Sequence, residues 1–277
     1  MEYRIIADSS CDLTAELKEE WGVTTVPFEM TLGRKQFTDD DSLDLPAFMK
    51  EMAACTERIG SSAPPPYLFK KAFEGTHTSF AVTLSGKLSA CYQNAMIGKK
   101  MAEEEAKADV HVFDSLSASA GEVLVAQKIH QLIKAGMEKS VIIANISRFI
   151  QDMRTYFILE NINNLLKNGR LGKITGLLIT KLGIKPIMCA DEHGNIALFA
   201  KARGYKQSLE KMADTIRSSG KATENESLVI THCNNLPAAQ LLAELIRNRY
   251  NFREILILST KGLSSVYTDD KGIVMAF

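Results

Sequence analysis

Pairs of serine residues follow three short apolar runs in this chain of 277 residues, and their spacing indicates a site for an anionic or oxygen-rich group. The pairs are Ser9 and Ser10, Ser85 and Ser89, and Ser115 and Ser117. Hydroxyls and free backbone N–H groups hold a carboxylate without a formal counter-charge, whereas a dianionic phosphate more often recruits arginine or several lysines. The pairs therefore favour a singly charged head group. Each serine taken alone is explained more simply as a helix cap, so the prediction depends on the three pairs meeting.

Three strands, each followed by a helix, would bring these pairs together. Residues 4–7, 80–84 and 110–113 are apolar and partly β-branched, which is typical of buried strands. If the strands are parallel neighbours, their carboxyl ends share one edge of a sheet, where open α/β sheets bind ligands and helix N-termini favour anions. We therefore expect the serine pairs to line one rim.

Another hydroxyl pair, Ser61 and Ser62, precedes three prolines at 64–66. Prolines exclude helix and stiffen the chain, so we predict a rigid loop that presents both hydroxyls. The alternative is an exposed turn in which Ser62 caps a helix over 67–73.

The order of predicted elements indicates an α/β protein of two domains. Residues 1–155 would form an open, mostly parallel sheet with flanking helices. Residues 156–277 would form a two-layer α/β domain whose mixed sheet includes a hairpin over 184–202. We place the boundary near Thr155.

Local patterns give further expectations within these domains. Apolar and β-branched residues predict a strand over 23–30 and a short strand over 266–268. Asp12 is placed to cap a helix over 13–21, and Gly169 to end a helix over 161–168.

Composition excludes several classes of function. Lys plus Arg and Asp plus Glu number 33 each, so no excess charge favours nucleic acid, and we expect at most transient contact with a membrane. The N-terminus has no signal-peptide layout, and the five cysteines include no CxxC pair, which favours reduced thiols in a cytoplasm. The five histidines are isolated from one another, so we expect no metal site.

An enzyme that uses a serine or cysteine nucleophile is an alternative. The GxSxG pattern of hydrolases is absent around Ser85 and Ser89. Cys11 and Cys91 lie at expected strand-to-helix turns, where a helix N-terminus can lower a thiol pKa, although a buried structural role is the more common one.

The basic, glycine-rich segment with Gly169, Arg170 and Lys173 is a candidate partner-binding loop. It lacks the GxxxxGK[ST] spacing of a P-loop and follows a helix instead of a strand, so a solvated linker is favoured over a phosphate cradle.

Several motifs, taken in order, resemble those of the DegV family, bacterial lipid-binding proteins some of which serve as the fatty-acid-binding component of a fatty acid kinase. The resemblance covers essentially the whole chain, through the segments DSSCDL at 8–13, SSAP at 61–64, SGKLSACYQNA at 85–95, VFDS at 112–115 and NLLKNGRL at 164–171.

This resemblance implies a long-chain fatty acid as ligand, no metal or organic cofactor, and a separate ATP-dependent fatty acid kinase subunit as partner. Residues 1–155 would enclose the acyl chain, and residues 156–277 would close over the head group. By motif, the carboxylate ligands would be Ser61, Ser62 and Ser89, with Arg203 within reach.

The end of the chain departs from the family pattern. Tyr267 stands where the family has a histidine of the head-group site, and Asp269 and Asp270 replace Gly-Pro. A tyrosine donates a hydrogen bond but does not readily carry positive charge, and two acidic residues facing the site would weaken anion binding. The departure therefore bears on phosphorylation of the ligand more than on lipid binding. A non-catalytic adaptor with a vestigial pocket is a further alternative.

Overall fold

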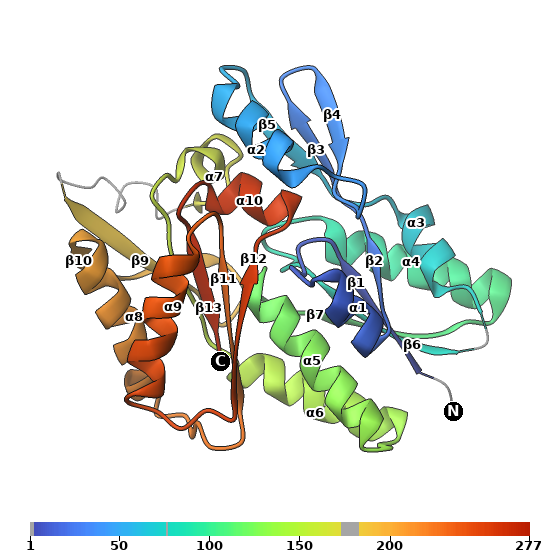
Figure 1. Cartoon of the computed structure of the whole chain (residues 1–277). Coiled ribbons are helices and arrows are strands. Elements are labelled where there is room, and N and C mark those ends of the chain that lie inside the picture. Colours follow the sequence, from blue (N-terminus) through green and yellow to red (C-terminus); the bar gives the residue numbers. More distant parts are fainter. Residues whose placement is uncertain (1–2, 76, 173–182) are drawn as a thin grey trace.

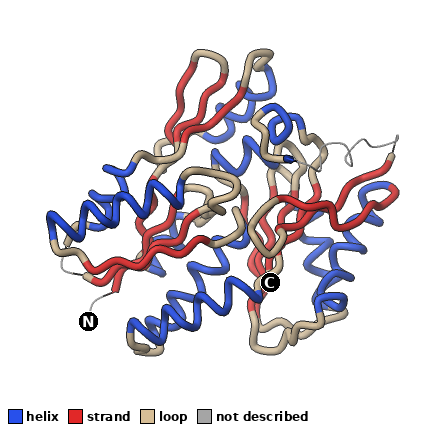
Figure 2. Tube along the Cα trace, turned by 180° about the vertical axis from the view of Figure 1, so that it is seen from behind, coloured by secondary structure: helices blue, strands red, loops and turns tan. Residues whose placement is uncertain are grey.

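The described residues, 3–75, 77–172 and 183–277 of a computed structural model, form three β-sheets with helices packed around them (Figure 1). This confirms the α/β class. Seen from the opposite side, the smallest sheet projects from the two larger ones (Figure 2).

The first sheet is parallel throughout its described strands and contains the strands that precede the serine pairs. Its order is β2 (Val23–Val26), β1 (Tyr3–Asp8), β6 (Thr78–Thr83) and β7 (Asp109–Asp114). Ala7 pairs with Val82, and Val82 pairs with Phe113, so β1, β6 and β7 end at one level. The expectation of parallel neighbours with a shared rim is confirmed. The helices of this half are α1 (Ala15–Trp21), α3 (Pro66–Phe73), α4 (Cys91–Ala106), α5 (Ala120–Lys134) and α6 (Lys139–Asp152).

The projecting sheet is antiparallel and corrects two predictions. It joins β4 (Lys35–Thr38), β3 (Glu29–Leu32) and β5 (Ile59–Ser62), with α2 (Leu45–Ala54) beside it. The strand predicted over 23–30 is two strands in different sheets, because Pro27 has no N–H to continue a ladder. Ser61 and Ser62 end strand β5, where we predicted a loop; they pair with Met30 and Glu29.

The third sheet is mixed, as predicted for the second half of the chain. Its order is β10 (Ile196–Arg203), β9 (Ile184–Ala190), β8 (Thr155–Ile158), β13 (Ile273–Ala276), β11 (Ser227–His232) and β12 (Glu254–Ser259). Helices α8 (Gly204–Ser219) and α9 (Leu236–Arg247) cover one face, and α7 (Asn163–Lys167) precedes Gly169.

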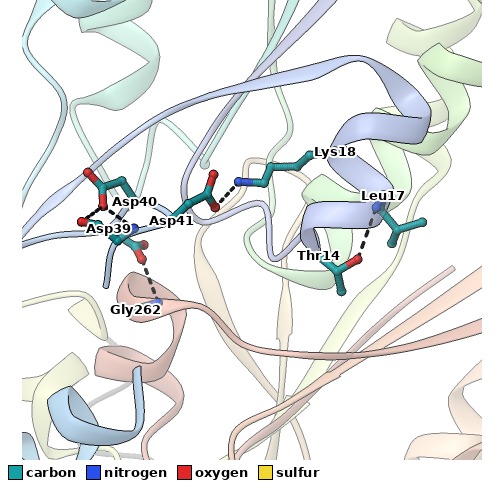
Figure 3. A network of polar contacts seen from close by, with 8 residues as sticks. Thr14, Leu17, Lys18, Asp39, Asp40, Asp41 and Gly262 are labelled. Carbon is teal, nitrogen blue, oxygen red and sulfur yellow. Dashed lines mark hydrogen bonds and ion pairs between the residues drawn. The ribbon is translucent and has the colours of Figure 1, made fainter. Parts of the chain in front are cut away.

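The strand predicted over 266–268 is wrong, because these residues end helix α10 (Gly262–Thr268). The Asp39 carboxylate accepts a hydrogen bond from the Gly262 N–H at 2.9 Å (Figure 3). It accepts a second from the Leu263 N–H, also at 2.9 Å, and so caps this helix from a distant part of the chain. These bonds offset the local preference of Val-Tyr-Thr for strand.

The cap predicted for Asp12 is also wrong. Thr14 caps α1 by accepting a hydrogen bond from the Leu17 N–H at 3.3 Å (Figure 3). Asp12 instead accepts one from the Lys261 N–H at 2.6 Å, so it holds the residue that precedes α10.

Helix α5 lies between the two larger sheets. It packs against β1 and β6 on one side and against β11 and β13 on the other, and one buried cluster runs from Ile5 through Leu124 to Val229 and Val274. The domain boundary near Thr155 therefore stays a prediction, although every described strand from Thr155 onward joins the third sheet.

Candidate ligand-binding site

A cavity of about 210 Å³ lies where the carboxyl edge of the first sheet meets the third sheet and α10. Apolar side chains from both halves of the chain line it, among them Leu84, Leu116, Phe157, Leu159 and Ile196. We expected the apolar enclosure to come from residues 1–155 alone, so the contribution of the third sheet is new. A mostly apolar cavity with a few polar groups is the usual form of a small-molecule site.

Hydrogen-bond donors are present in the wall of this cavity. The hydroxyls of Ser61 and Tyr267 lie 2.8 Å apart, and because only one of them donates in this contact, the other proton is free for a ligand. The Ser89 hydroxyl accepts from the Cys91 N–H at 3.2 Å, and no described residue accepts its proton. These three predicted head-group residues therefore line the same cavity, and two of them, Ser61 and Tyr267, are in contact.

Arg170, assigned from the sequence to a partner-binding loop, lines the same cavity. Gly169, with a φ of 71° that suits glycine, ends the preceding helix. The Arg170 guanidinium donates from Nε to the Leu88 carbonyl at 3.0 Å and from Nη1 to the Asn168 carbonyl. Because arginine has five N–H donors in a rigid fork, these contacts fix the group and leave donors over. Lys173 lies outside the described residues.

Ser62 and Arg203 do not lie at the cavity. Both side chains are exposed, and neither lines it. Ser62 points away because Ser61 precedes it in a strand, where neighbouring side chains face opposite sides. Arg203 is the last residue of β10. Among the described residues that line the cavity, the half-buried Arg170 is the cation.

Of the serines expected at the rim, Ser10 and Ser117 line the cavity, whereas Ser9, Ser85 and Ser115 are buried and structural and do not line it. Ser9 accepts from the Phe28 N–H at 3.0 Å, and Ser115 donates to the Ser117 carbonyl at 3.2 Å.

Ser85 connects the two halves of the chain by donating to the Gly194 carbonyl at 2.8 Å. Gly194 has a φ of 82°, and a Cβ there would lie 2.3 Å from the Ser85 hydroxyl oxygen, so this close approach requires glycine.

Buried carboxyl groups stand behind the rim. Asp8 accepts from the Leu84 N–H at 2.7 Å, the Ser10 N–H at 2.9 Å and the Cys91 thiol at 3.0 Å. Glu122, in the first turn of α5, accepts from the Ser10 hydroxyl. Burial, and then the charge of Asp8, raises the pKa of Glu122 well above its usual range, and burial raises the pKa of Asp12 to about 7.

The thiols that could serve as nucleophiles are poorly suited to that role. Cys11 and Cys91 are buried, and burial raises the pKa of each thiol well above its usual range, with neighbouring carboxylates adding to the shift. A thiolate is the reactive form, so neither cysteine is activated. No histidine is among the described residues that line the cavity, so Ser89 has no general base of that kind there.

Some lining residues escaped the sequence analysis. Ser264 and Thr268 went unnoticed because α10 was expected to be partly strand, and Asn195 because the β9–β10 turn was read only as a hairpin. Ser119 and Thr155 also line the cavity. The one feature of the sequence that pointed to these two residues was that each follows a predicted element.

Comparison with known proteins decides the family. The family model described as an uncharacterised protein of the DegV family matches residues 2–276. The chain belongs to the DegV family. A DegV domain-containing protein of Streptococcus gordonii is 33% identical over 281 residues, covering 100% of this chain and 99% of the relative.

Solved DegV structures have the same fold. A DegV family protein from Ruminococcus gnavus with vaccenic acid is 36% identical, with a TM-score of 0.95 over 99% of both chains. The Streptococcus pneumoniae Fatty Acid Kinase (Fak) B3 protein, loaded with linoleic acid, is 33% identical, with a TM-score of 0.92 over 100% of this chain and 99% of that one. A DegV family protein from Eubacterium eligens, loaded with heptadecanoic acid, is 27% identical, with a TM-score of 0.90 over 99% and 98%.

The two acidic residues that depart from the DegV pattern do not line the cavity. Asp269 accepts from the Asn161 side chain at 2.7 Å, and Asp270 from the Asn234 side chain at 3.2 Å. Tyr267, in place of the family histidine, does line it.

The described ranges contain neither a candidate metal site nor a candidate membrane span. No group of three or more His, Cys, Asp or Glu side chains there is arranged to hold a metal ion. None of the helices in those ranges has the length and apolar character needed to cross a bilayer.

Proposed function

We propose that this DegV protein binds one long-chain fatty acid in the cavity. The observation that carries the proposal is that donors from Ser61 or Tyr267, Ser89 and Arg170 line one largely apolar cavity. A carboxylate needs such donors, and each methylene of the acyl chain adds about 0.8 kcal/mol when buried. The fatty acids named for relatives at 36%, 33% and 27% identity support this ligand class.

We further propose that the chain is a binding subunit and that an ATP-dependent kinase phosphorylates the presented carboxylate. The support is the similarity to the S. pneumoniae fatty acid kinase B3 protein. The buried, protonated thiols and the missing P-loop spacing argue against chemistry by this chain alone. The exposed Gly169 turn beside the cavity is our candidate partner contact, and the five free thiols support a reducing, cytoplasmic setting.

The ligand can be identified by extracting the purified protein under denaturing conditions and analysing the extract by mass spectrometry. We expect about one long-chain fatty acid per chain, and delipidated protein should take up oleic acid again. If no fatty acid co-purifies and the delipidated protein takes none up, the proposal is refuted. Covalent labelling of Ser89 by a fluorophosphonate would instead favour a serine-nucleophile enzyme.

A further inference from the structure

Some hydroxyls in the cavity wall point their protons into the protein instead of toward the ligand. The Ser10 hydroxyl donates to Glu122 Oε1. Glu122 is fully buried, and its Oε2 accepts no hydrogen bond within the described chain. The Glu122 carboxyl group also has Asp8 as a side-chain hydrogen-bond partner, so its acid proton can be shared with Asp8 while Oε1 accepts from Ser10.

The neighbouring hydroxyls follow the same rule. Ser119 donates to Asp12 Oδ2, so Thr231, 2.6 Å away, is the donor in its own contact with Ser119. Ser264 donates to the Ser10 carbonyl at 3.4 Å, and Thr268 donates to the Ser264 carbonyl at 2.7 Å. A hydroxyl has one proton and two lone pairs, so lone pairs of these groups remain for the cavity.

Whereas the part of the cavity wall that contains Arg170 presents hydrogen-bond donors, the part that contains Ser10 and Ser119 therefore presents hydrogen-bond acceptors. A carboxylate has no proton to offer it, and the buried carboxyls Asp8, Asp12 and Glu122 behind it disfavour a second negative charge. The group that satisfies such a wall is a neutral hydrogen-bond donor. An unsubstituted acyl chain offers these acceptors no partner, which is costly wherever the bound chain displaces water from them.

We propose that Ser10 and Ser119 form an acceptor site for a hydroxyl group on the acyl chain, so that the preferred ligands are hydroxylated long-chain fatty acids. This inference rests on the proposed function, with the carboxylate at Arg170 and Ser89. Arg170 and Ser89 then bind the carboxylate, and Ser10 and Ser119 bind the hydroxyl group. The apolar side chains of the cavity bind the rest of the acyl chain.

The test compares octadecanoic acid with a positional series of monohydroxy octadecanoic acids on delipidated, full-length protein. Affinities are measured by displacement of a fluorescent fatty acid at about pH 8, where Asp12 is mostly ionised and accepts the Ser119 proton. We expect at least one positional isomer to bind about fivefold to tenfold more tightly than octadecanoic acid, the gain expected from one added hydrogen bond. Parity or weaker binding across the whole series would overturn the proposal, because water would then satisfy the wall equally well.

Variants assign the effect to residues. Ser10→Ala should bring the ratio of the affinities for the preferred hydroxylated acid and for octadecanoic acid close to one. Glu122→Gln is the matched variant, because the amide can donate to Asp8 and still accept from Ser10, so it should keep the preference. A preference that survives Ser10→Ala would overturn the assignment. Failure of the wild type to bind octadecanoic acid and every hydroxylated isomer would refute the proposed function itself.

Discussion

At the scale of single residues, Arg170 and Arg203 differ in what surrounds them. Arg170 is half-buried, fixed by the carbonyls of Leu88 and Asn168, and in the cavity wall, whereas Arg203 is exposed at the end of β10. The affinity of a guanidinium for a carboxylate grows as water is excluded. Arg170 should therefore contribute most to holding the ligand.

Arg170→Gln is expected to weaken fatty-acid binding by about tenfold or more, because a charge-assisted hydrogen bond contributes about 1.5–3 kcal/mol. Arg203→Gln is the matched control and should change the affinity by less than about twofold. Fluorescent displacement on delipidated protein measures both. Equal losses in the two variants would mean that the head group lies elsewhere.

At the scale of elements, helix α10 positions Ser264, Tyr267 and Thr268, and Asp39 holds its start. Asp39 follows β4, so the projecting sheet and the cavity wall are connected through one carboxylate. Burial raises the pKa of Asp39, and the two N–H donors from α10 oppose that rise.

Asp39→Ala should lower the free energy of unfolding by about 1–2 kcal/mol, the range for loss of a helix cap, and should also weaken fatty-acid binding severalfold. Asp44→Ala removes the cap of α2, where the side chain accepts from the Ala47 N–H at 3.0 Å away from the cavity. That control should lose similar stability with unchanged affinity. Urea unfolding and ligand displacement separate the two effects, and unchanged affinity in Asp39→Ala would contradict the role of α10.

These elements also show what the sequence could predict. The strands before the serine pairs were found because each is a short apolar run followed by a turn, and parallel order then placed their ends together. The start of α10 was missed because its cap comes from Asp39, 223 positions away. The pattern of hydroxyls could name Ser61, Ser89 and Ser10, but not which protons turn inward, since that depends on Glu122 and Asp12 meeting them in the folded molecule.

At the scale of the whole molecule, α5 joins the two large sheets into one core, and Glu122 lies in its first turn. The fully buried Glu122 is surrounded by Asp8 and Asp12, and no described basic side chain pairs with it. Folding therefore transfers a carboxyl group to a place that favours its neutral form.

This transfer makes stability depend on pH in a defined direction. In the unfolded chain Glu122 ionises near pH 4.5, whereas in the folded protein its pKa is well above that value. Between the two pKa values the folded state binds more protons, so the free energy of unfolding falls as pH rises, by at most about 1.4 kcal/mol per pH unit from this group.

Glu122→Gln removes the dependence while keeping the shape and hydrogen bonds of the neutral acid. The variant should match the wild type near pH 4.5 and exceed it increasingly toward pH 8 in urea unfolding. Glu192→Gln, in the exposed turn between β9 and β10, should follow the wild type at every pH. A Glu122→Gln variant that is less stable than the wild type at pH 8 would contradict the neutral state of Glu122 in the folded protein, because a buried carboxylate that is charged would then be making the stronger hydrogen bond with Ser10.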